Sequence, residues 1–146
     1  MPGLRNGAVP DPQAITPAPS SRQIAIAMAR LALDAKADDV VVLDLRRLSY
    51  SFDFFVLCSA FSDRHSRAIA DDIQEKFSGR GIHPRHLEGR RDSGWTLLDY
   101  GPVVTHIFSP EMRRFYNLDR LWADAPRLSQ GTISGRQSPS KALRRP

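Results

Sequence analysis

Two stretches of the chain carry apolar residues at helical spacing. The first opens with a capping box at Ser20 and Gln23 and predicts a helix of about four turns that ends near Lys36. The second follows Ser62, a suitable N-cap, and ends at Gly79, where a C-terminal cap belongs. The apolar face of this second helix consists of Ile69, Ile73 and Phe77.

Strand-like composition marks five further stretches: residues 40–45, 54–58, 82–87, 95–100 and 103–108. The first two are apolar without alternation, as is typical of strands covered on both faces. Pro84 interrupts the third, which predicts an edge strand. Gly101 and Pro102 join the last two and predict a hairpin.

A short helix is predicted to start at Ser109, followed by Pro110 at the first helical position, and to continue towards Trp122. Pro126 then ends the predicted fold. The order is helix, strand, strand, helix, three strands, helix. It predicts an α/β protein with a single mixed β-sheet and flanking helices.

Composition divides the chain into a Pro-rich leader at residues 1–19, a globular core at 20–126 and a basic tail at 127–146. The chain has 21 Lys and Arg against 16 Asp and Glu, and its formal net charge is +5. The whole excess lies in the tail. Since few apolar residues there offset the entropy of ordering, we expect the tail to be disordered. It could add a weak, salt-sensitive RNA contact or be a solvated extension only.

Several classes of protein are excluded by the same composition. A chain of 146 residues with one cysteine predicts a single small domain without an internal disulfide or a multi-cysteine zinc site. Such cysteine usage favours the cytoplasm. No apolar run approaches the roughly 18 residues of a membrane span, and the leader lacks the apolar stretch of a signal peptide.

Catalytic motifs are incomplete. Metal-assisted nucleotidyl transfer needs two close carboxylates, usually Asp-x-Asp, yet no acidic residue has another acid two positions away. The P-loop and dinucleotide glycine patterns are missing as well. We therefore predict a protein that is not an enzyme and has no cofactor.

The histidine and cysteine side chains that could bind a metal or react have simpler structural interpretations. His83 and His86 suggest a metal site, but the proline between them opposes a helix, and an exposed edge strand explains them better. Cys58 lies within an apolar strand, which predicts a buried structural thiol. For His106 a hydrogen-bonded structural histidine is favoured, and a partner-facing histidine is the alternative.

Large aromatic residues gather in the last third of the core, where acidic residues lie between them. The aromatic residues are Trp95, Tyr100, Phe115, Tyr116 and Trp122. Aromatic side chains beside carboxylates suit an interface with a basic partner. For Phe115 and Trp122, core packing is at least as good an interpretation. Trp95 follows the polar loop 89–94 and is better placed as an exposed anchor.

Collinear sequence blocks give the chain a resemblance to a known family. The blocks are Val41–Leu45, Asp53–Ser59, Ser66–Asp71, Glu88–Gly89, Gly94–Gly101 and Phe115–Trp122. They cover essentially the whole core, and the Trp-x-Leu-Leu-Asp-Tyr-Gly block together with the Phe-Tyr-x-Leu-Asp-Arg-Leu-Trp block is specific. The chain resembles the ribosomal silencing factor family, RsfS, also called Iojap-like proteins.

This resemblance implies a nucleotidyltransferase-like α/β fold that is non-catalytic, in agreement with the missing carboxylate pair. It also implies a translational repressor. Family members bind ribosomal protein L fourteen of the large ribosomal subunit, at the face where the small subunit docks, and so prevent subunit joining when nutrients are short. An exposed aromatic face and the resemblance both favour a homodimer.

The partner-binding residues carried over from the resemblance are Trp95, Leu97, Leu98, Asp99 and Tyr100, with Glu88, Asp53 and His106 as secondary candidates. Side chains alternate along a strand, so Trp95, Leu97 and Asp99 share one face, and one of the two faces belongs to the core. The aromatic members would bury apolar area, and the acids would meet basic residues of a ribosomal protein.

One departure from the family pattern concerns this surface. Pro102 stands where the family usually has Asp, which removes an acid and an N–H donor from the hairpin. We expect weaker affinity if that acid contributes to binding. The alternative function is a nucleotide-binding or nucleotidyltransferase enzyme with a noncanonical site. Such an enzyme should have acids that converge on one cleft, whereas the sequence offers only the isolated Asp44, Asp53 and Asp99.

Overall fold

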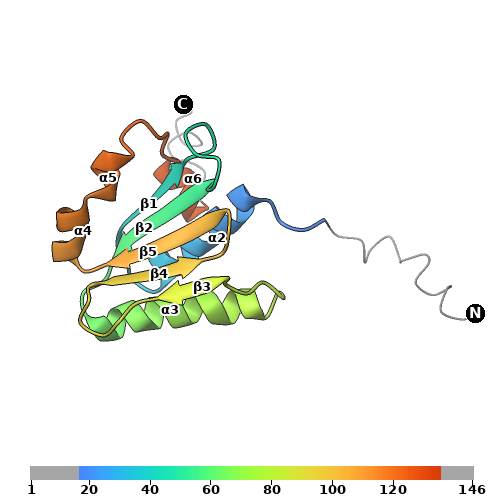
Figure 1. Cartoon of the computed structure of the whole chain (residues 1–146). Coiled ribbons are helices and arrows are strands. Elements are labelled where there is room, and N and C mark those ends of the chain that lie inside the picture. The colour runs from blue at the N-terminus through green and yellow to red at the C-terminus, as the bar shows by residue number, and fades with distance from the viewer. Residues whose placement is uncertain (1–16, 136–146) are drawn as a thin grey trace, which may run out of the picture.

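The computed structural model describes residues 17–135, which form one five-stranded sheet (Figure 1). Its order is β1-β2-β5-β4-β3, with the bounds Asp38–Asp44 (β1), Phe54–Ser59 (β2), His86–Glu88 (β3), Trp95–Asp99 (β4) and Val103–Phe108 (β5). Strands β2 and β5 are parallel, and the other neighbouring pairs are antiparallel. The predicted single mixed sheet is confirmed.

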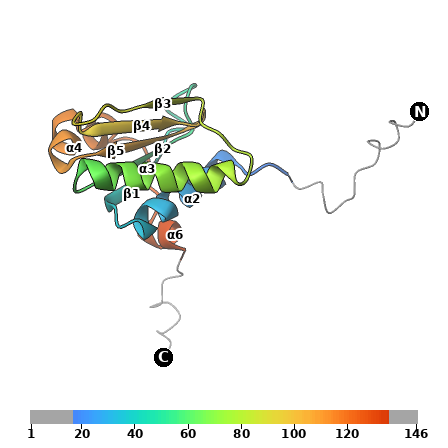
Figure 2. The same cartoon turned by 90° about the horizontal axis from the view of Figure 1, so that it is seen from below.

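Helices cover both faces of this sheet (Figures 1 and 2). Their bounds are Ser21–Asp34 (α2), Asp63–Ser78 (α3), Pro110–Tyr116 (α4), Leu118–Leu121 (α5) and Gln130–Ser134 (α6). Helices α2 and α3 pack on one face, and α6 packs against α2. The opposite face is covered in part by α4 and α5. Within residues 17–135, no helix is both long enough and apolar enough to cross a membrane.

Both long helices begin where the sequence predicts. The Ser20 hydroxyl accepts a hydrogen bond from the Gln23 amide at 3.1 Å, and the Gln23 side chain accepts one from the Ser20 amide at 2.8 Å. The Ser62 hydroxyl caps α3 by accepting a hydrogen bond from the His65 amide at 3.1 Å, and Gly79 ends that helix. These caps satisfy amide groups that would otherwise lack partners in the first turn. The apolar face of each helix packs against the sheet.

Strand β3 lies at the edge of the sheet, as predicted, but it spans only His86–Glu88, whereas the sequence predicts a strand over residues 82–87. Pro84 has no N–H to donate to a neighbouring strand, and the first hydrogen bond to β4 comes from the next residue, where the Arg85 amide donates to the Asp99 carbonyl at 2.7 Å. The hairpin of β4 and β5 around Gly101 is confirmed. It ends with the Tyr100 amide donating to the Val103 carbonyl at 2.9 Å.

The predicted end of the fold at Pro126 is wrong. Arg127 forms a β-bridge with Leu43, and the Leu128 amide donates to the Val42 carbonyl at 3.0 Å. Ile133 on α6 is fully buried, and the Arg30 guanidinium donates to its carbonyl at 2.9 Å. Leu128 and Ile133 both pack against the core, and they hold residues 127–135 in place although the average composition of the tail predicted disorder. The rest of the predicted tail, 136–146, and most of the predicted leader, 1–16, lie outside the described residues.

Candidate protein-binding surface

The loop between β3 and β4 is fixed at its end by Gly94. This glycine has φ +74°, and a Cβ there would lie 2.5 Å from Met112 Cγ and 2.9 Å from Ser109 Oγ. The Ser109 amide also donates to the Gly94 carbonyl at 2.9 Å. Only glycine combines this backbone conformation with so close an approach. The loop is thereby held against the start of α4, and Trp95 follows in a defined position.

Trp95 is half-buried and held on several sides. Its ring centroid lies 4.4 Å from that of Tyr116 and 5.2 Å from that of Phe108. Its indole N–H donates to His106 Nδ1 at 3.1 Å. These contacts fix the side chain while leaving part of the ring open to solvent.

His106 lies beneath Trp95 and is only 4% exposed. Because Nδ1 accepts the indole proton, the ring proton resides on Nε2, which has no hydrogen-bond partner among the described residues. Burial lowers the pKa of His106 to about 4, so the ring is neutral at pH 7. The predicted burial of His106 is confirmed, but its Nε2 lacks the partner that a fully hydrogen-bonded structural histidine would have. At 4% exposure His106 cannot be an exposed contact residue, so its prediction as a partner-binding residue is wrong.

A groove of about 440 Å³ opens beside Trp95. We call it the Trp95 groove, and it is lined by Glu88, Gly89, Arg90, Ser93, Trp95, Leu97 and Tyr116. Tyr116 also contacts Phe115, whose ring centroid lies 5.0 Å away. Phe115 is 71% exposed and Tyr116 is 44% exposed. An aromatic row therefore runs from the buried face of the sheet out to solvent, which is the character of a protein-binding surface.

A buried ion pair holds α4 and α5 in place. Arg113 is 6% exposed. Its guanidinium donates to both carboxylate oxygens of Asp119, at 2.9 and 3.2 Å. It also donates to the Asp39 carbonyl at 3.0 Å and to Ser59 Oγ at 3.1 Å. The hydrogen bond from Arg113 holds the pKa of the Asp119 carboxyl below its ordinary value. The aromatic row on α4 is thus tied to the sheet.

Among the predicted site residues, the structure brings Trp95, Leu97 and Glu88 together at the Trp95 groove. Asp99 sits at the far end of β4, where its carboxylate accepts from the Gly101 amide at 2.8 Å. Asp53 precedes β2, and its carboxylate accepts from the Ser21 hydroxyl at 2.7 Å. Both acids lie at the hairpin end of the sheet, so the groove does not include them.

Leu98 and Tyr100 cannot be exposed contact residues, and their prediction as such is wrong. Leu98 is 1% exposed and Tyr100 is 8% exposed, both in the core that α2 and α3 cover. The Tyr100 ring centroid lies 5.8 Å from that of Phe77 on α3. Alternation along β4 requires this outcome once Trp95 and Leu97 face the other way.

The groove residues missing from the predicted set are Gly89, Arg90, Ser93 and Tyr116. The sequence marks Tyr116 as one of the aromatic residues in the last third of the core, but its contact with Trp95 depends on the path of the chain through β5 into α4. Of the two interpretations left open for Phe115, core packing is wrong, because the residue is largely exposed. Trp122 does pack there, with its ring centroid 5.9 Å from that of Phe55.

The residues considered for chemistry have individual structural partners. Asp44 accepts two hydrogen bonds from the Arg46 guanidinium, at 2.9 and 2.7 Å, and these hold its pKa below the ordinary value. Cys58 is fully buried as predicted, and burial raises the pKa of its thiol to about 12. His86 contacts Glu88 at 3.0 Å. Residues 17–135 contain no cluster of three or more His, Cys, Asp and Glu that could hold a metal ion.

Fold and surface together define a small α/β protein with an aromatic groove suited to binding another macromolecule. The model of the family described as ribosomal silencing factor during starvation, RsfS, matches residues 18–145. The chain therefore belongs to the RsfS family, and the resemblance drawn from the sequence blocks is confirmed.

Individual relatives agree with this assignment. The ribosomal silencing factor RsfS of Halalkalibacterium halodurans is 39% identical over 102 residues, covering 69% of this chain and 87% of the relative. The protein Iojap of Zea mays chloroplasts is 38% identical over 102 residues, which is 69% of this chain and 44% of Iojap. A crystal structure from Chromobacterium violaceum superimposes with a TM-score of 0.68 at 28% identity, covering 72% of this chain and 88% of that one.

Proposed function

We propose that this protein represses translation by binding ribosomal protein L fourteen on the large ribosomal subunit through the Trp95 groove, which keeps the small subunit from joining. The observation that carries the proposal is the state of Trp95. Three neighbouring rings and one hydrogen bond hold this side chain, yet it still opens onto a groove. Rigid, partly exposed aromatic residues are the usual anchors of protein interfaces.

Pre-organisation supports the same conclusion. A partner that binds this surface need not order Trp95 or Tyr116, so little conformational entropy is lost on association. Glu88 lies at the rim of the groove, with its side chain 66% exposed. An exposed carboxylate at the rim would steer and orient a basic ribosomal protein more than it would add affinity.

Repression then needs no chemistry. By globular scaling, a domain the size of residues 17–135 has a radius of gyration of about 13 Å. A body of these dimensions on the joining face of the large subunit excludes the small subunit by occupying its place. A cytoplasmic location and a homodimer remain predictions from the sequence.

Cosedimentation with purified large subunits tests the proposal. Tyr116→Ala removes an exposed member of the groove, and we expect it to weaken binding by about tenfold or more, the loss typical of an interface anchor. Tyr50→Ala is the matched control, because Tyr50 is fully exposed on the loop between β1 and β2. Equal binding by the two variants would contradict the assignment of the groove.

A further inference from the structure

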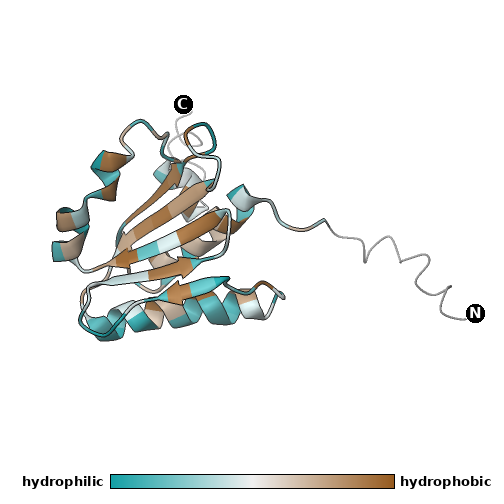
Figure 3. Cartoon of the chain, viewed as in Figure 1, coloured by the Kyte–Doolittle hydropathy of each residue, from teal (hydrophilic) through white to brown (hydrophobic). Residues whose placement is uncertain are grey.

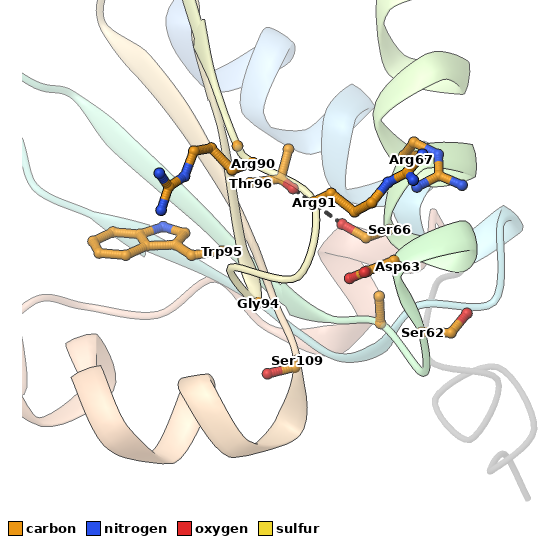
Figure 4. A pocket seen from close by; sticks show the side chains of 12 residues that line it. Ser62, Asp63, Ser66, Arg67, Arg90, Arg91, Gly94, Trp95, Thr96 and Ser109 are labelled. Carbon is orange, nitrogen blue, oxygen red and sulfur yellow. Dashed lines mark hydrogen bonds between the residues drawn. The ribbon is translucent and has the colours of Figure 1, made fainter.

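A second hollow, of about 170 Å³, lies on the other side of the loop between β3 and β4 (Figure 4). It runs between this loop and the first turns of α3. Three arginines line it, Arg67 from α3 and Arg90 and Arg91 from the loop, and we call it the arginine cleft. Hydroxyl groups of Ser66 and Thr96 line it as well and contact each other at 3.2 Å.

Positive charge exceeds negative charge at the arginine cleft, because three arginines line it and the neighbouring acids are Asp63 and Asp92. Asp63 is the acidic member of the lining, and its carboxylate accepts a hydrogen bond from the Asp92 amide at 3.1 Å. Within residues 17–135, no ion pair joins Arg67, Arg90 or Arg91 to a carboxylate. Figure 4 shows Arg67 and Arg91 on the α3 side of the loop, whereas Arg90 extends the other way, towards Trp95. Guanidinium groups that line one hollow repel each other, and an anion bound in the hollow would offset that repulsion.

The size of the cleft indicates what kind of anion it accepts. Pockets that enclose a small molecule usually measure about 300 to 1,000 Å³, so a hollow of about 170 Å³ takes a phosphate group and not a whole nucleotide. Guanidinium groups are well matched to phosphate oxygens, and hydroxyls donate further hydrogen bonds. The cleft therefore suits one phosphate of a longer chain.

The position of the cleft indicates the source of that phosphate. Gly89, Arg90 and Trp95 line both the cleft and the Trp95 groove, so the two hollows are neighbours across one loop. A protein seated on the large subunit through the groove brings the cleft to the perimeter of the contact. We propose that the arginine cleft binds a backbone phosphate of ribosomal RNA next to the docked ribosomal protein. This inference rests on the proposed function.

Salt dependence of binding to large subunits tests the inference. The double variant Arg67→Gln, Arg91→Gln removes two exposed charges, and Arg22→Gln, Lys76→Gln removes two exposed charges elsewhere as the control. Loss of one phosphate contact makes the negative slope of log K against log salt shallower by about 0.7 to 0.9. If the affinities are equal at about 1 M salt, this is about a five- to eightfold loss of affinity at 0.1 M salt. We expect this loss for the first variant and none for the control. An unchanged slope, or an equal loss in the control, would overturn the inference.

Binding to isolated ribosomal protein L fourteen, free of RNA, separates the two proposals. The arginine double variant should bind it as the unaltered protein does, whereas Tyr116→Ala should bind it more weakly. No binding by the unaltered protein would contradict the proposed function itself, and an equal loss in both variants would overturn the RNA assignment alone. Inorganic phosphate and ATP, titrated by NMR, should bind no tighter than millimolar. Micromolar binding of either would make the cleft a small-molecule site and also overturn the RNA assignment.

Discussion

Replacing Asp119 by Asn tests whether the buried ion pair stabilises α4 and α5. Arg113 is 6% exposed, and two of its four hydrogen bonds go to the Asp119 carboxylate. Without that carboxylate, the buried guanidinium keeps two neutral hydrogen-bond acceptors, and a carboxylate oxygen of the exposed Asp39 lies 3.9 Å away. Breaking a fully buried pair costs about 3 to 5 kcal/mol, but the Asp119 side chain is 24% exposed and partly screened. We therefore expect the free energy of unfolding to fall by about 2 kcal/mol.

Urea denaturation followed by circular dichroism measures this loss. Asp124→Asn is the matched control, because Asp124 is exposed. The pKa of Asp119 is depressed in the folded state, so its contribution is present above about pH 4 and is lost as the pH falls through the folded pKa. The difference between Asp119→Asn and the unaltered protein should therefore shrink below about pH 4. Equal stability of the Asp119 and Asp124 variants at pH 7 would refute the reasoning.

Three further changes test other parts of the structure. The pKa of His106 is about 4 against about 6.5 unfolded, so the free energy of unfolding should fall by up to about 3 kcal/mol as the pH drops from 6.5 to 4. His106→Gln should remove the His106 part of that dependence, and a slope between about pH 6.5 and 5 equal to that of the unaltered protein would contradict it. Ile133→Ala should cost about 2 to 4 kcal/mol in urea denaturation, whereas an unaffected midpoint would mean that α6 is not part of the core. Gly94→Ala should lower both stability and large-subunit binding, measured by denaturation and cosedimentation, since a Cβ meets Met112 and Ser109. Normal behaviour in both assays would contradict that account.

Local patterns in the sequence predicted most of the fold. Caps at Ser20 and Ser62 and the unbroken apolar strands β1 and β2 are decided by nearest neighbours, and the structure confirms them. The hydropathy of these strands stands out in Figure 3. Helix α6 could not be predicted in the same way. Ile133 finds its partners on α2, about a hundred residues earlier, and a compositional average conceals such a contact.

The candidate site was predictable only in part, for a related reason. Alternation along β4 separates Trp95 and Leu97 from Leu98 and Tyr100 but does not say which set faces solvent. Packing of α2 and α3 against Leu98 decides that question. The pairing of Trp95 with Tyr116 likewise depends on how α4 follows β5. Both are tertiary contacts that no single stretch of sequence contains.

The rate and extent of association between purified ribosomal subunits, followed by light scattering, test the central claim most directly. Added in slight molar excess over large subunits, the protein should suppress the rise in scattering, with Tyr50→Ala as effective as the unaltered chain and Tyr116→Ala much less so. Full association of the subunits with the unaltered protein present would contradict the account.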